Sequence, residues 1–136
     1  MDIEVEPMEN TERSYVISVK KLQENEKLPK GIIVRNLEEE KKNGITDINF
    51  AVFRDYSYDR YTYLKLNGEY SGKTSRYTLL MFLVYNGNGE LIDASFDEKL
   101  PDDFKGKKTF SKTIQVPNDE YISKVTVRVI PDPVFL

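Results

Sequence analysis

The sequence lacks three residue types whose chemistry proteins commonly use. It contains no cysteine, no histidine and no tryptophan among its 136 residues. Without cysteine there can be no disulfides, no thiol catalysis and no cysteine-based metal sites. Without histidine, the commonest general base and the commonest transition-metal ligand are missing. No glycine-rich phosphate loop or nucleophile motif is present either. We therefore expect a protein that is not an enzyme and that uses no cofactor.

Charge of one sign and long apolar runs are also scarce. The 20 basic and 23 acidic residues are interleaved and give a net charge of −3. A nucleic-acid-binding surface would need a basic stripe, so no nucleic-acid partner is expected. No apolar run approaches the ~20 residues that a membrane-spanning helix needs, so no membrane span is expected either.

The beginning of the sequence leaves the localisation open. The first residues, Met1 to Glu6, lack the basic and apolar regions of a secretory signal peptide. If Met1 is the natural start, a cytoplasmic protein is expected. If Met1 instead follows a leader that was removed, export or attachment to the cell surface is expected.

Short stretches of alternating apolar and polar residues recur along the chain, and all six prolines fall between these stretches or at their ends. This pattern predicts one all-β domain over residues 1–136, an antiparallel β-sandwich of seven or eight strands. Residues 1–12 are expected to form a frayed terminus or a short edge strand, and residues 55–59 a loop. The predicted strands are 13–20, 31–35, 45–54, 60–70, 76–85, 90–96, 109–116 and 121–130.

Residues 36–43 carry the signals of one short helix. Asn36 can cap its start, Glu39 sits at the third position of a capping box, and Gly44 can close its end. An isolated helix of this length is marginal. A charged turn between two strands therefore remains an alternative.

The most apolar window, residues 76–85, is followed by Asn-Gly-Asn-Gly at 86–89 and by a second apolar run at 90–96. Asn-Gly supplies the positive φ angles that the tight turn of a two-strand hairpin needs, at little steric cost. These residues therefore predict a β-hairpin at the centre of the domain. The alternation places on its core face Leu80, Phe82, Val84, Ile92, Ala94 and Phe96.

The end of this window resembles a known family signature. Residues 82–86 are similar to the Phe-any-Leu-Tyr-Asp motif of the FxLYD domain, with Phe82 and Tyr85 matching, Val84 in place of leucine and Asn86 in place of aspartate. Gly89 matches a glycine that tends to follow the motif, and the resemblance covers residues 60–130.

FxLYD domains are small immunoglobulin-like sandwiches of bacterial and archaeal proteins, which are often exported or attached to the cell surface. No catalytic residues are associated with them. The resemblance therefore implies a structural motif, in which Phe82 and Val84 would face the core and Asn86 would shape the turn.

The other face of the predicted central strand is also apolar, whereas a sandwich strand normally carries polar residues there. This outward stripe consists of Tyr77, Leu79, Met81, Leu83 and Tyr85. One interpretation is that the N-terminal segment covers it within the chain, for instance through Ile32, Ile33 and Leu37. The other is that the stripe is an interface for a second copy or a partner protein.

A group of tyrosines offers a second candidate site. It consists of Tyr56, Tyr58, Tyr61 and Tyr63, in and after the expected loop. Exposed tyrosines at strand ends can stack on carbohydrate or peptide ligands at low entropic cost. The alternative is ordinary strand propensity, because tyrosine favours sheets.

Two groups of charged side chains allow further hypotheses. The acids around one loop are Asp93, Asp97, Glu98, Asp102 and Asp103. They could supply the oxygen ligands that Ca²⁺ takes, but their spacing matches no EF-hand. A solvated acidic loop is the simpler interpretation. The one basic concentration is expected to form a solvated sheet edge that discourages pairing with other sheets: Lys105, Lys107, Lys108 and Lys112. No metal site is predicted.

These observations together predict a non-catalytic protein-interaction or structural module. A carbohydrate-binding module that uses the tyrosines and a cytoplasmic assembly subunit are the alternatives. The expected partner is another protein or a second copy of the chain, and no small-molecule ligand is expected.

Overall fold

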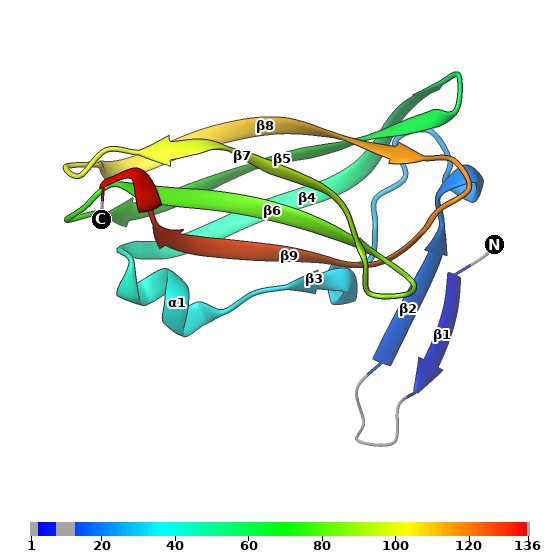
Figure 1. Ribbon diagram of the computed structural model, residues 1–136, viewed down its shortest axis with the longest axis horizontal. Coiled ribbons are helices and arrows are strands. Elements are labelled where there is room, and N and C mark those ends of the chain that lie inside the picture. The colour runs from blue at the N-terminus through cyan, green and yellow to red at the C-terminus, as the bar shows by residue number, and fades with distance from the viewer. Residues whose placement is uncertain (1–2, 8–12, 136) are drawn as a thin grey trace.

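The computed structural model describes the backbone of residues 3–7 and 13–135, and the side chains of this range except those at 3–7, 13–15 and 95–97. The described chain forms two antiparallel β-sheets that pack face to face, with one short α-helix beside them (Figure 1). The prediction of an all-β antiparallel sandwich is confirmed.

The first sheet, which we call sheet A, has the strand order β1-β2-β9-β6-β7, and β3 also pairs with β9. Strand β9 therefore lies in the interior of the sheet. It pairs with β6 on one side and with β2 and then β3 on the other, and only the β3 pairing is parallel. The strands are β1 (Ile3–Pro7), β2 (Arg13–Ser18), β3 (Ile33–Val34), β6 (Thr78–Asn86), β7 (Leu91–Leu100) and β9 (Tyr121–Pro131).

The second sheet, sheet B, has three long strands in the order β4-β5-β8. They are β4 (Ile45–Tyr58), β5 (Tyr61–Lys73) and β8 (Lys105–Pro117), and short 3₁₀ helices lie at η1 (Val19–Lys21), η2 (Lys30–Ile32) and η3 (Pro133–Phe135). The β4–β5 hairpin reaches beyond the rest of the sandwich at one end, and the β1–β2 hairpin extends away from it on another side (Figure 1).

The core lies between the inward faces of the two sheets and is rich in aromatic side chains. Phe82 of β6 is fully buried and contacts Phe50 of β4 edge to face, at 5.2 Å between ring centroids. It also stacks on Phe110 of β8 at 5.1 Å. The chain of rings continues from Phe110 to Tyr70 of β5 at 6.0 Å. One aromatic cluster therefore joins sheet A to all three strands of sheet B.

The short helix predicted at 36–43 is present as α1 (Leu37–Lys42). The Asn36 side chain caps it by accepting a hydrogen bond from the backbone N–H of Glu39 at 3.0 Å. Gly44 follows the helix with φ +88°, a conformation that favours glycine. The capping box does not form, because the Glu39 carboxylate points instead toward β9.

The side chains of α1 and its C-cap bind the exposed edge of β9. Glu39 Oε1 accepts a hydrogen bond from the backbone N–H of Val129 at 3.0 Å. The Glu39 carboxylate also accepts hydrogen bonds from Nε and Nη2 of Arg128. Asn43 Nδ2 donates to the Val129 carbonyl at 2.9 Å. The hydrogen bonds from Arg128 hold the pKa of Glu39 below its usual value, against partial burial that would raise it. The backbone N–H and carbonyl of Val129 at this edge of β9 therefore bond to side chains and not to another strand.

The hairpin predicted over residues 76–96 is present as β6 and β7. In its turn the N–H of Asn86 bonds the Glu90 carbonyl and Gly89 adopts φ +80°. Two local predictions were wrong. Residues 55–59 are not a loop, because β4 continues to Tyr58 and only Asp59 and Arg60 connect it to β5. Ala94 pairs with Leu83 on the outer face, because a register shift in β7 changes the alternation, and the Phe96 side chain lies outside the described residues.

Candidate functional site

Strand β6 is apolar on both faces, as the alternation predicted. Leu80, Phe82 and Val84 are fully buried on the core side. The outward side chains are half-buried, apart from Tyr77, which is 38% exposed. We refer to these outward residues as the β6 stripe: Tyr77, Leu79, Met81, Leu83 and Tyr85.

In the described part of the N-terminal segment, the residues expected to cover the β6 stripe lie elsewhere, beside or within the sandwich. Ile32 is buried in the core, and Ile33 pairs with Val125 as part of β3, on the side of β9 that is away from β6. Leu37 of α1 is 65% exposed. At one end the stripe has a contact within the chain, because Phe135 of η3 stacks on Tyr77 at 4.0 Å between ring centroids.

The strands on either side of the β6 stripe supply basic neighbours. Lys99 of β7 lies opposite Leu79 and Lys124 of β9 lies opposite Tyr85. The Lys124 Nζ lies 4.8 Å from the centre of the Tyr85 ring, in a cation–π contact. The other described register neighbours of Leu79, Met81, Leu83 and Tyr85 include no acid; they are Leu91, Ala94, Thr126, Arg128 and Ile130.

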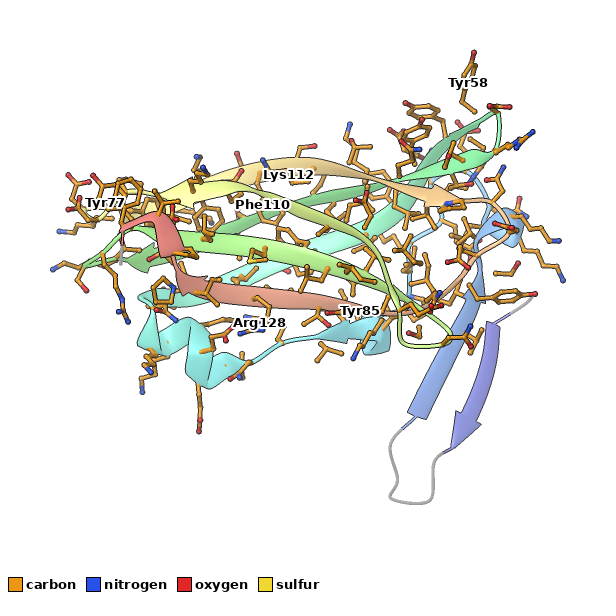
Figure 2. All side chains as sticks on the ribbon, viewed as in Figure 1. Tyr58, Tyr77, Tyr85, Phe110, Lys112 and Arg128 are labelled. Carbon is orange, nitrogen blue, oxygen red and sulfur yellow. The ribbon has the colours of Figure 1, made fainter. Side chains whose placement is uncertain are left out.

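The four candidate tyrosines lie together on the outer face of sheet B. Tyr56 pairs with Tyr63 and Tyr58 with Tyr61 across the β4–β5 hairpin, so all four side chains share one face. The rings of Tyr56 and Tyr63 stack at 4.6 Å with an angle of 17° between their planes. Figure 2 shows Tyr58 at the hairpin tip, directed away from the sandwich. We call this surface the tyrosine face.

A chain of polar side chains runs along the opposite face of the same hairpin. Thr62 is fully buried and donates to Asn118 Oδ1 at 2.6 Å. Because its proton is used there, Ser57 donates to the Thr62 oxygen at 2.8 Å, and Arg54 Nη2 donates to Ser57 at 3.0 Å. The backbone N–H of Asn118 also bonds the carbonyl of Arg60 at 2.8 Å. These bonds fix the hairpin to the loop that follows β8.

A hollow of about 410 Å³ adjoins the tyrosine face, within the size range of ligand pockets. It is lined by Asp59, Arg60, Tyr61, Pro117, Asn118 and Asp119. The sequence singled out only Tyr61 among these residues. The others come from two turns that lie far apart in the chain, and no local pattern signals that β5–β8 pairing brings those turns together.

Those acidic residues considered for Ca²⁺ whose side chains are described do not converge on one point. Glu98 is buried, Asp93 accepts from the backbone N–H of Gln115 at 3.1 Å, and Asp102 and Asp103 are exposed. The Asp97 side chain lies outside the described residues. Among the side chains that the structure describes, no three acids are grouped so that they could hold a metal ion.

Glu98 instead takes part in a buried cluster between the sheets. Tyr70 donates to Glu98 Oε2 at 2.8 Å, and Lys112 Nζ lies 3.1 Å from Oε1. Lys108 adds a longer contact of 3.6 Å. Lys108 and Lys112, which were expected at a solvated edge, therefore pair with a buried acid. Lys107 pairs with Glu69 at the surface, and Lys105 is exposed.

Of the motif residues, Phe82 and Val84 lie in the core, Tyr85 lies on the outward β6 stripe, and Asn86 and Gly89 lie in the turn. Asn86 is buried, and its Oδ1 accepts from the backbone N–H groups of Asn88 and Glu90, both at 2.9 Å. Its Nδ2 donates to the Glu90 and Glu120 carboxylates. Asn86 therefore organises the turn through its side chain.

The described residues include no helix that is long and apolar enough to cross a membrane. Comparisons with protein-family models, with curated proteins and with solved structures gave no match for the chain.

Proposed function

We propose that the protein is a non-catalytic interaction module that binds another protein through the β6 stripe. The observation that carries this proposal is that β6 is apolar on both faces while only one face lies in the core. An apolar stripe on the outside of a sheet is characteristic of an interaction surface. The resemblance of residues 82–86 to the FxLYD motif supports an immunoglobulin-like, non-enzymatic module.

The chemistry of the neighbouring residues indicates the partner. Lys99 and Lys124 are exposed at the two ends of the stripe, and Arg128 is already neutralised by Glu39. A partner segment with apolar side chains and acidic flanks would complement this arrangement. A second copy would bring the same basic neighbours together, so we propose a different protein as the partner.

The test combines oligomeric state with peptide selection. Light scattering after gel filtration is expected to show a monomer. Panning a displayed random-peptide library on the immobilised protein is expected to enrich peptides that combine apolar residues with Asp or Glu. Binding of a selected peptide should weaken with added salt, because exposed charges are screened.

Matched variants make the selection specific to this surface. Leu83→Asp and the pair Lys99→Glu and Lys124→Glu should each abolish binding of the selected peptides. Thr113→Asp on the outer face of sheet B should leave it intact, since Thr113 is exposed there. A wild-type dimer that Leu83→Asp dissociates would overturn the proposal, as would selected peptides without acids.

A further inference from the structure

We propose that the tyrosine face and the hollow beside it form a second binding site, for the uncharged sugar residues of a polysaccharide. This site lies on sheet B and does not depend on the β6 stripe. The proposal rests on three features of the β4–β5 hairpin: the exposure of its rings, the free polar groups at its tip, and its rigid backing.

The rings are accessible where a ligand would need them. Tyr58 is 72% exposed and Tyr56 is 50% exposed. Tyr61 and Tyr63 are half-buried opposite them across the hairpin, and the Tyr63 ring stacks on Tyr56. The apolar C–H face of a sugar ring stacks on such rings, and the phenol hydroxyls remain available for hydrogen bonds. The strand propensity of tyrosine alone does not explain why four tyrosines share one face. Nor does it explain why the side chains of Tyr56 and Tyr58 are at least half exposed on that face.

The hollow supplies polar side chains that are free of bonds to the part of the chain that the structure describes. The side chains of Asp59, Arg60 and Asp119 are exposed and make no hydrogen bond or ion pair among the described residues. Two carboxylates accept hydrogen bonds and a guanidinium donates them, which suits the mixed donors and acceptors of sugar hydroxyls. The excess of acid disfavours an anionic ligand such as a phosphate or a sulfated glycan.

The polar chain behind the rings holds the site in one shape. The hairpin reaches beyond the rest of the sandwich (Figure 1). On its inward face, Thr62 and Ser57 form hydrogen bonds with Asn118 and Arg54. A surface that is ordered before binding loses less conformational entropy when the ligand arrives. This preorganisation is what a recognition site of exposed rings requires.

The geometry favours sugar over an extended peptide. Sheets that capture peptides do so along a strand edge, through backbone hydrogen bonds. Here the rings lie on the face of the hairpin and not along the outer edge of β4. Stacking and hydroxyl contacts are the interactions that such a face offers, and a peptide ligand becomes an outcome of the test.

Affinity electrophoresis of the full chain in gels containing xylan, mannan, mixed-linkage β-glucan, soluble chitosan or hydroxyethyl cellulose tests the proposal. We expect at least one neutral polysaccharide to retard the protein. The double variant Tyr56→Ala and Tyr58→Ala should weaken that binding by about tenfold or more, because two stacking contacts are lost. Asp119→Asn should weaken it less, since an amide still bonds hydroxyls.

Tyr121→Ala is the matched control, because Tyr121 is 47% exposed on sheet A. It should bind polysaccharide as the wild type does, and circular dichroism should show that all variants are folded. Absence of retardation in every neutral gel would overturn the proposal. So would retention of binding by the double tyrosine variant, or retardation by chitosan alone, which would indicate attraction of a polycation to the acids. Binding of a proline-rich peptide with no polysaccharide binding would also overturn it.

Failure here is distinguishable from failure of the proposed protein interaction. The tyrosine variants should leave peptide selection on the β6 stripe unchanged, and Leu83→Asp should leave polysaccharide binding unchanged.

Discussion

Glu98 of β7 and Lys112 of β8 form an ion pair of 3.1 Å that joins the two sheets, with only 8% and 16% of the side chains exposed. These strands are consecutive in the chain, yet they belong to different sheets. The pair therefore ties together two strand edges that share no backbone ladder among the described pairings.

Glu98→Gln should destabilise the protein by about 2 kcal/mol, because Lys112 is left largely buried without a countercharge. Urea denaturation measures the change in the free energy of unfolding. The control is Glu69→Gln, which removes a 2.9 Å pair with Lys107 whose side chain is 61% exposed. This control should cost less than about 0.5 kcal/mol. Equal losses for the two variants would contradict a special role of the buried pair.

The same cluster should shape the dependence of stability on pH. Burial would raise the pKa of Glu98, but hydrogen bonds from Tyr70 and Lys112 and the nearby lysine charges hold it below its ordinary value. Its contribution is therefore present above the unfolded pKa of about 4.3 and is lost as pH falls through the lower folded pKa. Burial and the bond to Glu98 raise the pKa of Tyr70. That contribution is present below about pH 10 and is lost as pH rises beyond it.

Denaturation midpoints across acid and alkaline pH test these signs. Relative to the wild type, Glu98→Gln should flatten the acid side of the stability curve and Tyr70→Phe the alkaline side. An acid side that is unchanged by Glu98→Gln would show that other carboxylates dominate it.

Two adjacent residues of β6 should respond very differently to substitution. Phe82→Ala should cost about 4 kcal/mol, because Phe82 is fully buried against Phe50 and Phe110. Leu83→Asp should cost about 1 kcal/mol or less, since Leu83 lies on the outer face. Thermal unfolding followed by circular dichroism compares the two. Unfolding of the Leu83 variant would mean that the stripe is covered within the chain.

Thr62→Val should cost about 2 kcal/mol, because two hydrogen bonds are lost: the half-buried Asn118 loses a donor and Ser57 loses an acceptor. The valine keeps the shape of the side chain, so the loss reports the hydrogen bonds. Hydrogen exchange should locate the added mobility in residues 54–63. Unaltered exchange there would show that the hairpin is rigid without this network.

The sequence predicted those structural features that depend on residues close together in the chain. Asn36 signalled the start of α1, and the alternation in residues 78–86 gave the buried and outward faces of β6 correctly. The extent of β4 was missed, because Asp55, Ser57 and Asp59 are typical of loops. Pairing of Tyr56 and Tyr58 with β5 overrides that local preference.

The sites themselves depend on contacts between distant residues. Thr62 meets Asn118, and Glu98 meets Lys112, only once the register of β8 is set. A single sequence contains no periodicity that reports such pairs. The acids at 93–103 illustrate the limit, since their chemistry was visible in the sequence but their partners were not.

The interior position of β9 has a consequence for how the molecule can be made. β9 follows every other described strand in the chain, yet β2, β3 and β6 all use it as their partner in sheet A. During synthesis, the hydrogen-bonded pairings of these three strands with β9 cannot form until residues 121–131 have left the ribosome. Sheet B needs only residues up to 117. The nascent chain therefore exposes the apolar inner face of sheet B until residues 121–131 become available, and sheet A is completed only when this nonlocal pairing can form.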